Sequence, residues 1–145
     1  MNTMLRFSYA VKLTPDRKDG GYVVTCRDIP EAITQGESKD QAIAEAEGAL
    51  QAAIEGRIED GLEVPAPSQP KRGERVATTP ITTALKAAVY MALRDSGISK
   101  SELARRMQVN EKEARRMLDP KHQTKVPTLE RALAALGRRA EIEVN

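Results

Sequence analysis

Cysteine, histidine and aromatic residues are scarce in this 145-residue chain, and each shortage excludes a class of site. Cys26 is the only cysteine and His122 the only histidine, so a single chain has the residues for neither a disulfide framework nor a Cys/His metal cluster. The sequence therefore predicts no metal site, no cofactor and no Ser/His or Cys/His catalytic pair. Aromatic residues make up only 3% of the chain, which excludes a large aromatic core. Cys26 lies in an alternating apolar stretch, so we expect it to be a small core residue.

Long hydrophobic runs are also missing. No stretch approaches the roughly 18 apolar residues that a membrane-spanning helix needs. The first residues lack a charged start followed by an apolar run, which is the pattern of a secretory signal. The sequence therefore predicts a cytoplasmic protein with no membrane partner.

The charges, in contrast, are plentiful and unevenly placed. Residues 1–70 carry 7 Lys and Arg against 12 Asp and Glu, a net charge of −5. Residues 71–145 carry 16 against 9, a net charge of +7. The basic half suits a nucleic-acid partner and the acidic half suits a basic protein, although the charges of each half could also serve solubility alone.

The acidic half predicts a small sheet followed by a helix. Residues 5–13 and 22–30 alternate in the manner of strands, and the short turn between them predicts an antiparallel hairpin. Residues 31–36 can add a third strand. Ser38 and Gln41 then form a capping-box pattern at the start of a helix that runs to Gly61. This helix contains Gly48 and Gly56, for which a close approach between helix and sheet is one reason.

Residues 62–80 contain four of the eight prolines, which indicates a connecting segment. We therefore expect a first domain over 1–66, a Pro-rich linker over 67–80 and a second domain over 81–145. A fourth strand over 74–79 could still join the first sheet.

The basic half predicts four helices. The first runs from Thr82 to about Gly97, with an inward face of Leu85, Ala88, Val89, Ala92 and Leu93. Capping residues start the next two helices at Ser99 and Asn110, and Pro127 starts the last, which ends at Gly137. The tail alternates Ala140, Ile142 and Val144 with charged residues, which is typical of a strand. Because a lone strand is unstable, we expect these three residues to pair with their copies in a homodimer.

The second and third of these helices match a helix-turn-helix. Their apolar spacing places one set of residues inside: Leu103, Ala104, Met107, Val109, Ala114, Met117 and Leu118. It leaves one set of cations outside: Lys100, Arg105, Arg106, Lys112, Arg115 and Arg116. Ala104 supplies the small residue at the helix crossing, although Gln108 stands where the turn usually has Gly. A non-glycine residue at this turn is strained if its φ is positive.

In this motif the second helix faces base edges, which predicts base contacts by Glu111, Lys112, Arg115 and Arg116. The predicted phosphate contacts are Lys100, Arg105, Asn110, Lys121 and Lys125. The alternative is a helical hairpin whose charges are simply solvated.

Two segments together resemble the HicB-type antitoxins, in the variant that carries a helix-turn-helix. They are "GGYVVTCRDIPEAITQGES" with the "A-x-x-x-A-x-x-A-L" helix after it, and the region from "KAAVYMALRDSG" to "GRRAEIEV". The resemblance implies a partial RNase H-like fold in the first domain, which binds and blocks a HicA-type mRNA endonuclease toxin. It also implies a helical second domain that binds operator double-stranded DNA and represses the operon, in a dimer or higher oligomer. The toxin-contacting residues stay unknown within 5–60.

The likeness to RNase H raises the question of catalysis. Metal-assisted phosphodiester cleavage needs several carboxylates around the ions, and the central strand over 5–13 has no Asp or Glu. The sequence therefore predicts an α+β antitoxin and repressor that is not an enzyme. The alternative is a stand-alone transcription regulator whose first domain senses a small ligand.

Overall fold

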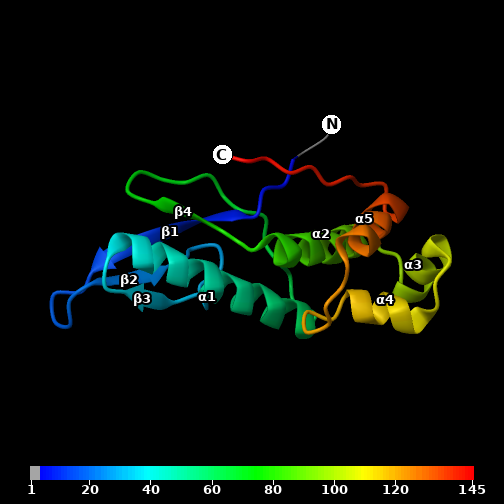
Figure 1. Cartoon of the computed structure of the whole chain (residues 1–145), viewed down its shortest axis with the longest axis horizontal. Helices are drawn as coiled ribbons and strands as arrows, with labels where there is room; N and C mark the ends of the chain where they lie inside the picture. Colours follow the sequence, from blue (N-terminus) through cyan, green and yellow to red (C-terminus); the bar gives the residue numbers. More distant parts are fainter. Residues whose placement is uncertain (1–3) are drawn as a thin grey trace. The chain divides into compact units, whose positions relative to one another are not determined.

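A four-stranded antiparallel sheet forms from the acidic half, in the order β3-β2-β1-β4 (Figure 1). The computed structural model describes residues 4–145. Its strands are β1 (Ser8–Pro15), β2 (Tyr22–Thr25), β3 (Thr34–Gly36) and β4 (Arg75–Thr78). The predicted hairpin is confirmed, because β1 and β2 pair antiparallel with Leu13 opposite Val24. Strand β4 lies inside the range 74–79 and pairs with β1, with Tyr9 opposite Ala77.

Helix α1 (Lys39–Glu59) covers one face of this sheet (Figure 1). The capping pattern forms at its start, since the Gln41 amide donates to the Ser38 Oγ at 3.1 Å and the Gln41 Oε1 accepts from the Glu37 amide at 2.8 Å. The buried side of the helix carries Ala42, Ala46, Leu50 and Ile54. These small and aliphatic residues, with Tyr9, Val11 and Val24 of the strands, form a core with few aromatics.

The close approach between helix and sheet occurs at Gly36, not at the helical glycines. A Cβ on Gly36 would lie 2.5 Å from the backbone nitrogen of Ala42. Gly48 and Gly56 have no such neighbour within 4 Å of the position a Cβ would take. The expectation that these two glycines mark a tight helix–sheet contact is therefore wrong.

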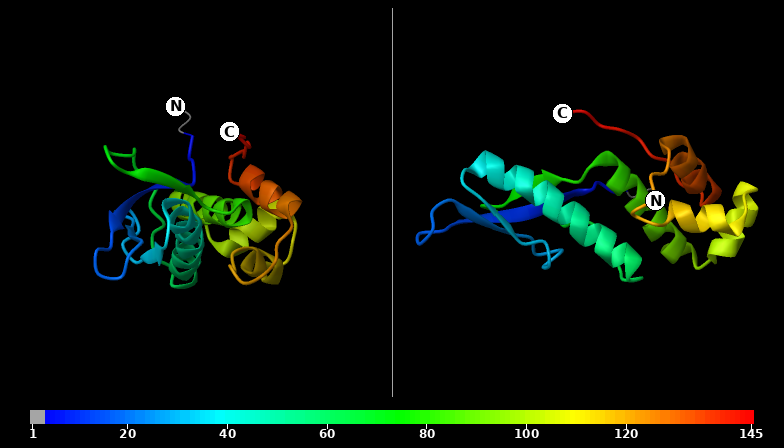
Figure 2. Two further views of the ribbon diagram at one scale, coloured as in Figure 1. Left: turned by 60° about the vertical axis from the view of Figure 1, so that its left-hand side comes forward. Right: turned by 60° about the horizontal axis from the view of Figure 1, so that its bottom comes forward.

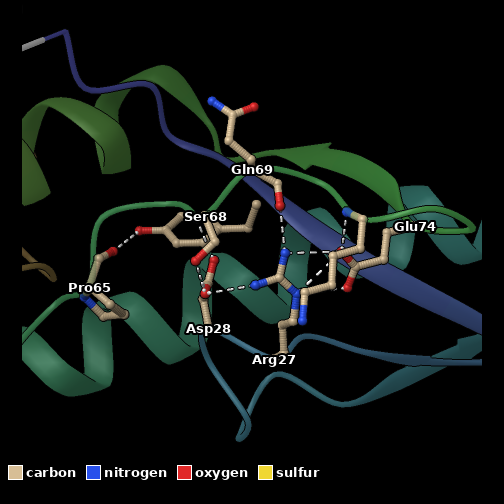
Figure 3. Close-up of polar contacts among 8 residues, drawn as sticks. Arg27, Asp28, Pro65, Ser68, Gln69 and Glu74 are labelled. Atoms are coloured by element: carbon tan, nitrogen blue, oxygen red, sulfur yellow. Dashed lines mark hydrogen bonds and ion pairs between the residues drawn. The ribbon is translucent and has the colours of Figure 1, made fainter.

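The proline-rich segment, residues 65–80, is hydrogen-bonded to the rest of the first unit. Arg27, just after β2, donates to both carboxylate oxygens of Glu74 and to the Gln69 carbonyl at 2.6 Å (Figure 3). Asp28 accepts from the amide and the hydroxyl of Ser68 at 2.8 and 2.7 Å. The bond from Arg27 holds the pKa of Glu74 below its usual value. These bonds join the segment expected as a Pro-rich linker to the residues that follow β2.

The basic half folds into four helices, as predicted. They are α2 (Ile81–Ser96), α3 (Lys100–Met107), α4 (Glu111–Met117) and α5 (Val126–Ala135). Helix α3 packs against α4 and α5, and α5 packs against α2 (Figure 2). The core contains Val89, Leu103, Met117 and Leu129, all fully buried.

The inward face of α2 is turned from the predicted one. Val89, Ala92 and Leu93 are buried as expected, but Leu85 and Ala88 are only half-buried. Lys86 and Ala87 are buried in their place. The prediction assumed that an apolar residue is buried in preference to a charged one. It was wrong here, because Lys86 is buried and Leu85 is not fully buried.

The chain divides into two units. The first contains residues 1–56 and 65–80, and the second contains residues 57–64 and 81–145. The last turn of α1 and the turn after it therefore group with the helices. In the second unit, Tyr90 Oη donates to the Leu62 carbonyl at 2.7 Å and Arg94 donates to the Gly61 carbonyl at 2.8 Å.

The predicted C-terminal strand does not form in the single chain. Helix α5 ends as expected, with Gly137 at a φ of 72° and the Arg138 amide donating to the Leu133 carbonyl. Residues 138–145 have no regular structure, and Ile142 and Val144 are 73% and 88% exposed. A strand needs a hydrogen-bonding partner, and one chain offers none to this tail. Among residues 4–145, no helix has the length and apolar character to cross a membrane.

Candidate nucleic-acid interface

The α3–α4 pair is built by its two N-caps and its buried residues. Ser99 Oγ accepts from the Glu102 amide at 3.1 Å, and Asn110 Oδ1 accepts from the Glu113 amide at 2.9 Å. The predicted inward residues are buried, apart from Val109, which is half-buried; they are Leu103, Ala104, Met107, Ala114, Met117 and Leu118. The predicted outward cations are all exposed; they are Lys100, Arg105, Arg106, Lys112, Arg115 and Arg116. The helical periodicity of the sequence therefore predicted this surface correctly.

Gln108 forms the turn between the two helices in a left-handed conformation. Its φ is 57° and its ψ is 43°, and no other described non-glycine residue has a positive φ. Its amide bonds back to the Arg105 carbonyl, and the Val109 amide bonds to the Ala104 carbonyl. The strain that the sequence predicted for a non-glycine turn residue is therefore present, and these bonds hold the turn in place.

Helix α4 presents two cations that no carboxylate of the described chain engages. Arg115 donates to the Glu111 carboxylate at 2.7 Å, one turn away on the same helix. Lys112 and Arg116 are exposed, and no hydrogen bond or ion pair joins the side chain of either residue to another residue within 4–145. Of the four predicted base-contacting residues, Lys112 and Arg116 thus have free charges, and Glu111 and Arg115 hold each other.

The predicted phosphate contacts fall into three groups. Lys100 and Lys125 are exposed and make no side-chain bond within the described residues. Arg105 and Lys121 are exposed but face carboxylates, Glu102 and, at 3.6 Å, Glu59. Asn110 uses its side-chain oxygen to cap α4, so its first role is structural.

The Glu102 carboxylate forms ion pairs with two arginines. It accepts from Arg105 Nε at 2.8 Å and from Arg106 Nε at 3.2 Å. These hydrogen bonds lower the pKa of Glu102 to about 2 and raise the pKa of Arg105 above its usual value. Glu102 is therefore ionised at neutral pH, and Arg105 must exchange this carboxylate for a phosphate if it contacts DNA.

Sequence reasoning missed the residues that hold the loops around this pair. Arg131 of α5 donates to the Met107 carbonyl at the end of α3, at 3.0 Å. Lys86 of α2 donates to the carbonyls of Asp119 and His122, which follow α4. The signal for Lys86 was its spacing, because it precedes Val89 by three residues and Leu93 by seven and so shares their helix face.

The rest of the described chain offers no competing metal centre. Within residues 4–145, His, Cys, Asp and Glu nowhere gather in a group of three that could hold an ion. Cys26 is buried, and that burial raises the pKa of its thiol. Asp16 accepts from the amides of Lys18 and Asp19 in the hairpin turn, which is a structural role.

The chain is similar to antitoxins along nearly all of its length. A family model described as the HicB-like antitoxin of bacterial toxin–antitoxin systems matches residues 8–88. "Antitoxin HicB" of Escherichia coli is 37% identical over 130 residues, which are 90% of this chain and 94% of that protein. "Antitoxin HicB 1" of Photorhabdus laumondii is 35% identical over 136 residues, 94% of this chain and 86% of that protein. "Antitoxin HicB" of Pseudomonas fluorescens is 31% identical over 145 residues, which are 99% of this chain and 98% of that protein.

Proposed function

The chain belongs to the family of HicB-like antitoxins of bacterial toxin–antitoxin systems, and from this premise we propose that it neutralises a HicA-type toxin and represses its own operon. The first unit binds the toxin, an mRNA endonuclease, and covers its active surface. The second unit binds operator DNA through α4. The proposal gives the chain no catalytic step of its own and places it in the cytoplasm, where both the toxin and the operator are found.

The family match supports the assignment of the toxin to the first unit, because the family model described as an antitoxin matches residues 8–88, which include most of that unit. Net charge adds little to this assignment. Residues 1–70 carry a net charge of −5, but the first unit itself, residues 1–56 and 65–80, carries 9 Lys and Arg against 10 Asp and Glu, a net charge of −1. The contact residues within 5–60 stay unassigned.

The free cations of α4 are the observation that carries the DNA-binding half of the proposal. The α3–α4 pair has the caps, the buried crossing residue and the short turn of a helix-turn-helix. In that motif the second helix enters the major groove. Lys112 and Arg116 are four residues apart, so they lie on the same side of α4 with unengaged charges. Arg116 suits a guanine edge, which a guanidinium binds with two hydrogen bonds.

A dimer completes the operator-binding form. A single recognition helix reads only a few base pairs, and two-fold proteins span two half-sites about one helical turn apart. The exposed tail, with Ala140, Ile142 and Val144 on one side, supplies a strand that pairs with its copy. Its irregular state in the single chain agrees with a segment that orders only in the dimer.

Substitution of Arg116 tests the DNA-binding half. We expect Arg116→Ala to weaken binding of the full chain to a duplex from upstream of its operon by about 1–3 kcal/mol, because one base contact is lost. Fluorescence anisotropy titrations at fixed salt measure this. The matched control is Arg17→Ala, which removes an exposed arginine from the hairpin turn of the first unit and should leave the affinity unchanged. Equal affinities for wild type and Arg116→Ala would remove Arg116 from the interface.

A further inference from the structure

Lys86 is a buried cation in the middle of the second unit. It lies on α2, its residue is only 5% exposed, and its Nζ donates to the backbone carbonyls of Asp119 and His122. Burying an ammonium group is costly unless hydrogen bonds replace its water. A lysine at this depth therefore persists because it does something that an aliphatic residue could not.

The two carbonyls belong to the turn that follows α4. Helix α4 ends at Met117, with Leu118 as its C-cap, and the turn runs from Asp119 to the N-cap of α5 at Lys125. Within the turn, the His122 amide bonds to the Asp119 carbonyl at 3.1 Å. The Lys121 amide bonds to the Asp119 Oδ1 at 2.9 Å. The turn is thus a bonded unit, and Lys86 attaches it to α2.

The electrostatics of the helix end favour this attachment. The carbonyls at the C-terminal end of a helix lack partners and carry partial negative charge. The Lys86 ammonium binds the carbonyls of Asp119 and His122, two and five residues beyond the last residue of α4, so it places a positive charge near this helix end without capping the helix's own carbonyls. Such a bond fixes both the end of α4 and the course of the turn relative to α2.

The turn carries two of the cations predicted to contact phosphates. Lys121 and Lys125 are both exposed, and both lie within six residues of Asp119. Lys86 itself is too buried to touch a duplex. We infer that Lys86 is a positioning residue for DNA binding, which holds Lys121 and Lys125 where they meet the phosphate backbone beside α4. This inference rests on the proposed operator binding by the second unit.

A double-mutant cycle on the full chain tests the inference. We expect Lys86→Met to weaken binding to the operon's upstream duplex about tenfold, and to reduce the slope of log affinity against log salt by about 1 to 2, because one or two phosphate contacts are lost. In a Lys121→Ala/Lys125→Ala background, Lys86→Met should alter the affinity less than about twofold, because the two lysines that Lys86 positions are already absent. A merely structural role would give the same loss in both backgrounds.

Hydrogen exchange and a matched variant separate the possible outcomes. Amides of residues 119–125 should exchange faster in Lys86→Met than in wild type. Val89→Ala truncates a buried residue of the same helix and should leave both the salt slope and this exchange unchanged. If Lys86→Met does not fold, Lys86→Gln, which keeps an N–H donor without the charge, takes its place in the cycle.

Two results would overturn the inference while leaving the proposed function intact. One is wild-type affinity and salt slope in Lys86→Met, and the other is an equal loss of affinity in both backgrounds. If wild type itself does not bind the duplex at low salt, the proposed DNA binding fails, and the positioning role fails with it. Faster exchange of residues 119–125 in Lys86→Met would then show that the anchor exists without that function.

Discussion

Gln108 shows how a single residue can keep a conformation that it does not favour. Its left-handed backbone costs a residue with a Cβ roughly 1–2 kcal/mol, and glycine avoids this cost. Part of the gain from glycine is offset by the greater entropy of the unfolded chain. We therefore expect Gln108→Gly to raise the free energy of unfolding by about 0.5–1 kcal/mol in urea denaturation.

Gln108→Ala is the control for this change, because it removes the side chain beyond Cβ but keeps the Cβ that causes the strain. It should give no such gain. If Gln108→Gly were no more stable than Gln108→Ala, the strain at this turn would not limit stability.

Glu102 gives the second unit a pH dependence of known sign. Its two arginines lower the pKa of its carboxyl from 4.5 to about 2. A lowered pKa in the folded state means that its contribution to stability is complete above pH 4.5 and is lost as the pH falls toward 2. We expect the difference in unfolding free energy between wild type and Glu102→Gln to shrink over this window, as measured by urea denaturation at several pH values.

The arginine side of this pair provides an independent check. Arg105→Gln removes the donor that lowers the pKa of Glu102 most, so it should reduce the same pH dependence. The ion-pair account would be contradicted if the difference in unfolding free energy between wild type and Glu102→Gln stayed constant from about pH 6 to pH 2.

At the residue scale, sequence predicts which side chains are exposed better than it predicts what they bind. The spacing around Ala104 placed the cations of α3 and α4 outside, and they are exposed. It did not reveal that Arg115 is held by Glu111 or that Lys121 faces Glu59. The first depends on rotamers and the second on a contact between residues 62 positions apart, and neither leaves a periodic signal.

The glycines of the first unit test the packing of its elements. Gly36→Ala would place a Cβ 2.5 Å from the Ala42 nitrogen at the start of α1. Because backbone atoms cannot move aside cheaply, we expect this change to lower the free energy of unfolding by about 1–3 kcal/mol. Thermal and urea denaturation measure this loss.

Gly48→Ala adds the same methyl group on the exposed side of α1, where nothing lies within 4 Å. It should raise stability by about 0.5–1 kcal/mol, because alanine favours a helix over glycine. Opposite signs for the two substitutions are expected. A Gly36→Ala chain as stable as wild type would show that β3 and α1 do not meet so closely.

At the element scale, local signals predicted the helix boundaries closely and the strand boundaries less well. The strand expected over 22–30 ends at Thr25, and the one expected over 31–36 begins at Thr34. Alternation, turn glycines and N-caps gave the hairpin, α1 and the four helices of the basic half. Local signals do not decide whether β4 forms, because its pairing with β1 joins residues far apart in the sequence. The tail had the alternation of a strand, but hydrogen bonding to another strand, not alternation, creates one.

At the scale of the whole molecule, we propose a division of labour between two units that differ in charge and in architecture. The boundary between them could not be predicted from composition. Prolines indicated a linker over 67–80, yet Asp28 and Arg27 bond this segment to the first unit. The helix α1 crosses the boundary, since its last turn groups with α2–α5. The unit that a segment joins depends on tertiary contacts, which proline content does not indicate.

Growth of cells that express the neighbouring toxin together with a Lys112→Ala/Arg116→Ala variant tests this division most directly. Both genes are placed under independent promoters, so that loss of repression does not alter the dose of either protein. The account predicts that the variant restores growth as fully as wild type, because toxin binding belongs to the first unit, while operator binding is lost. Failure of the variant to restore growth, at equal protein levels, would contradict the separation of the two functions.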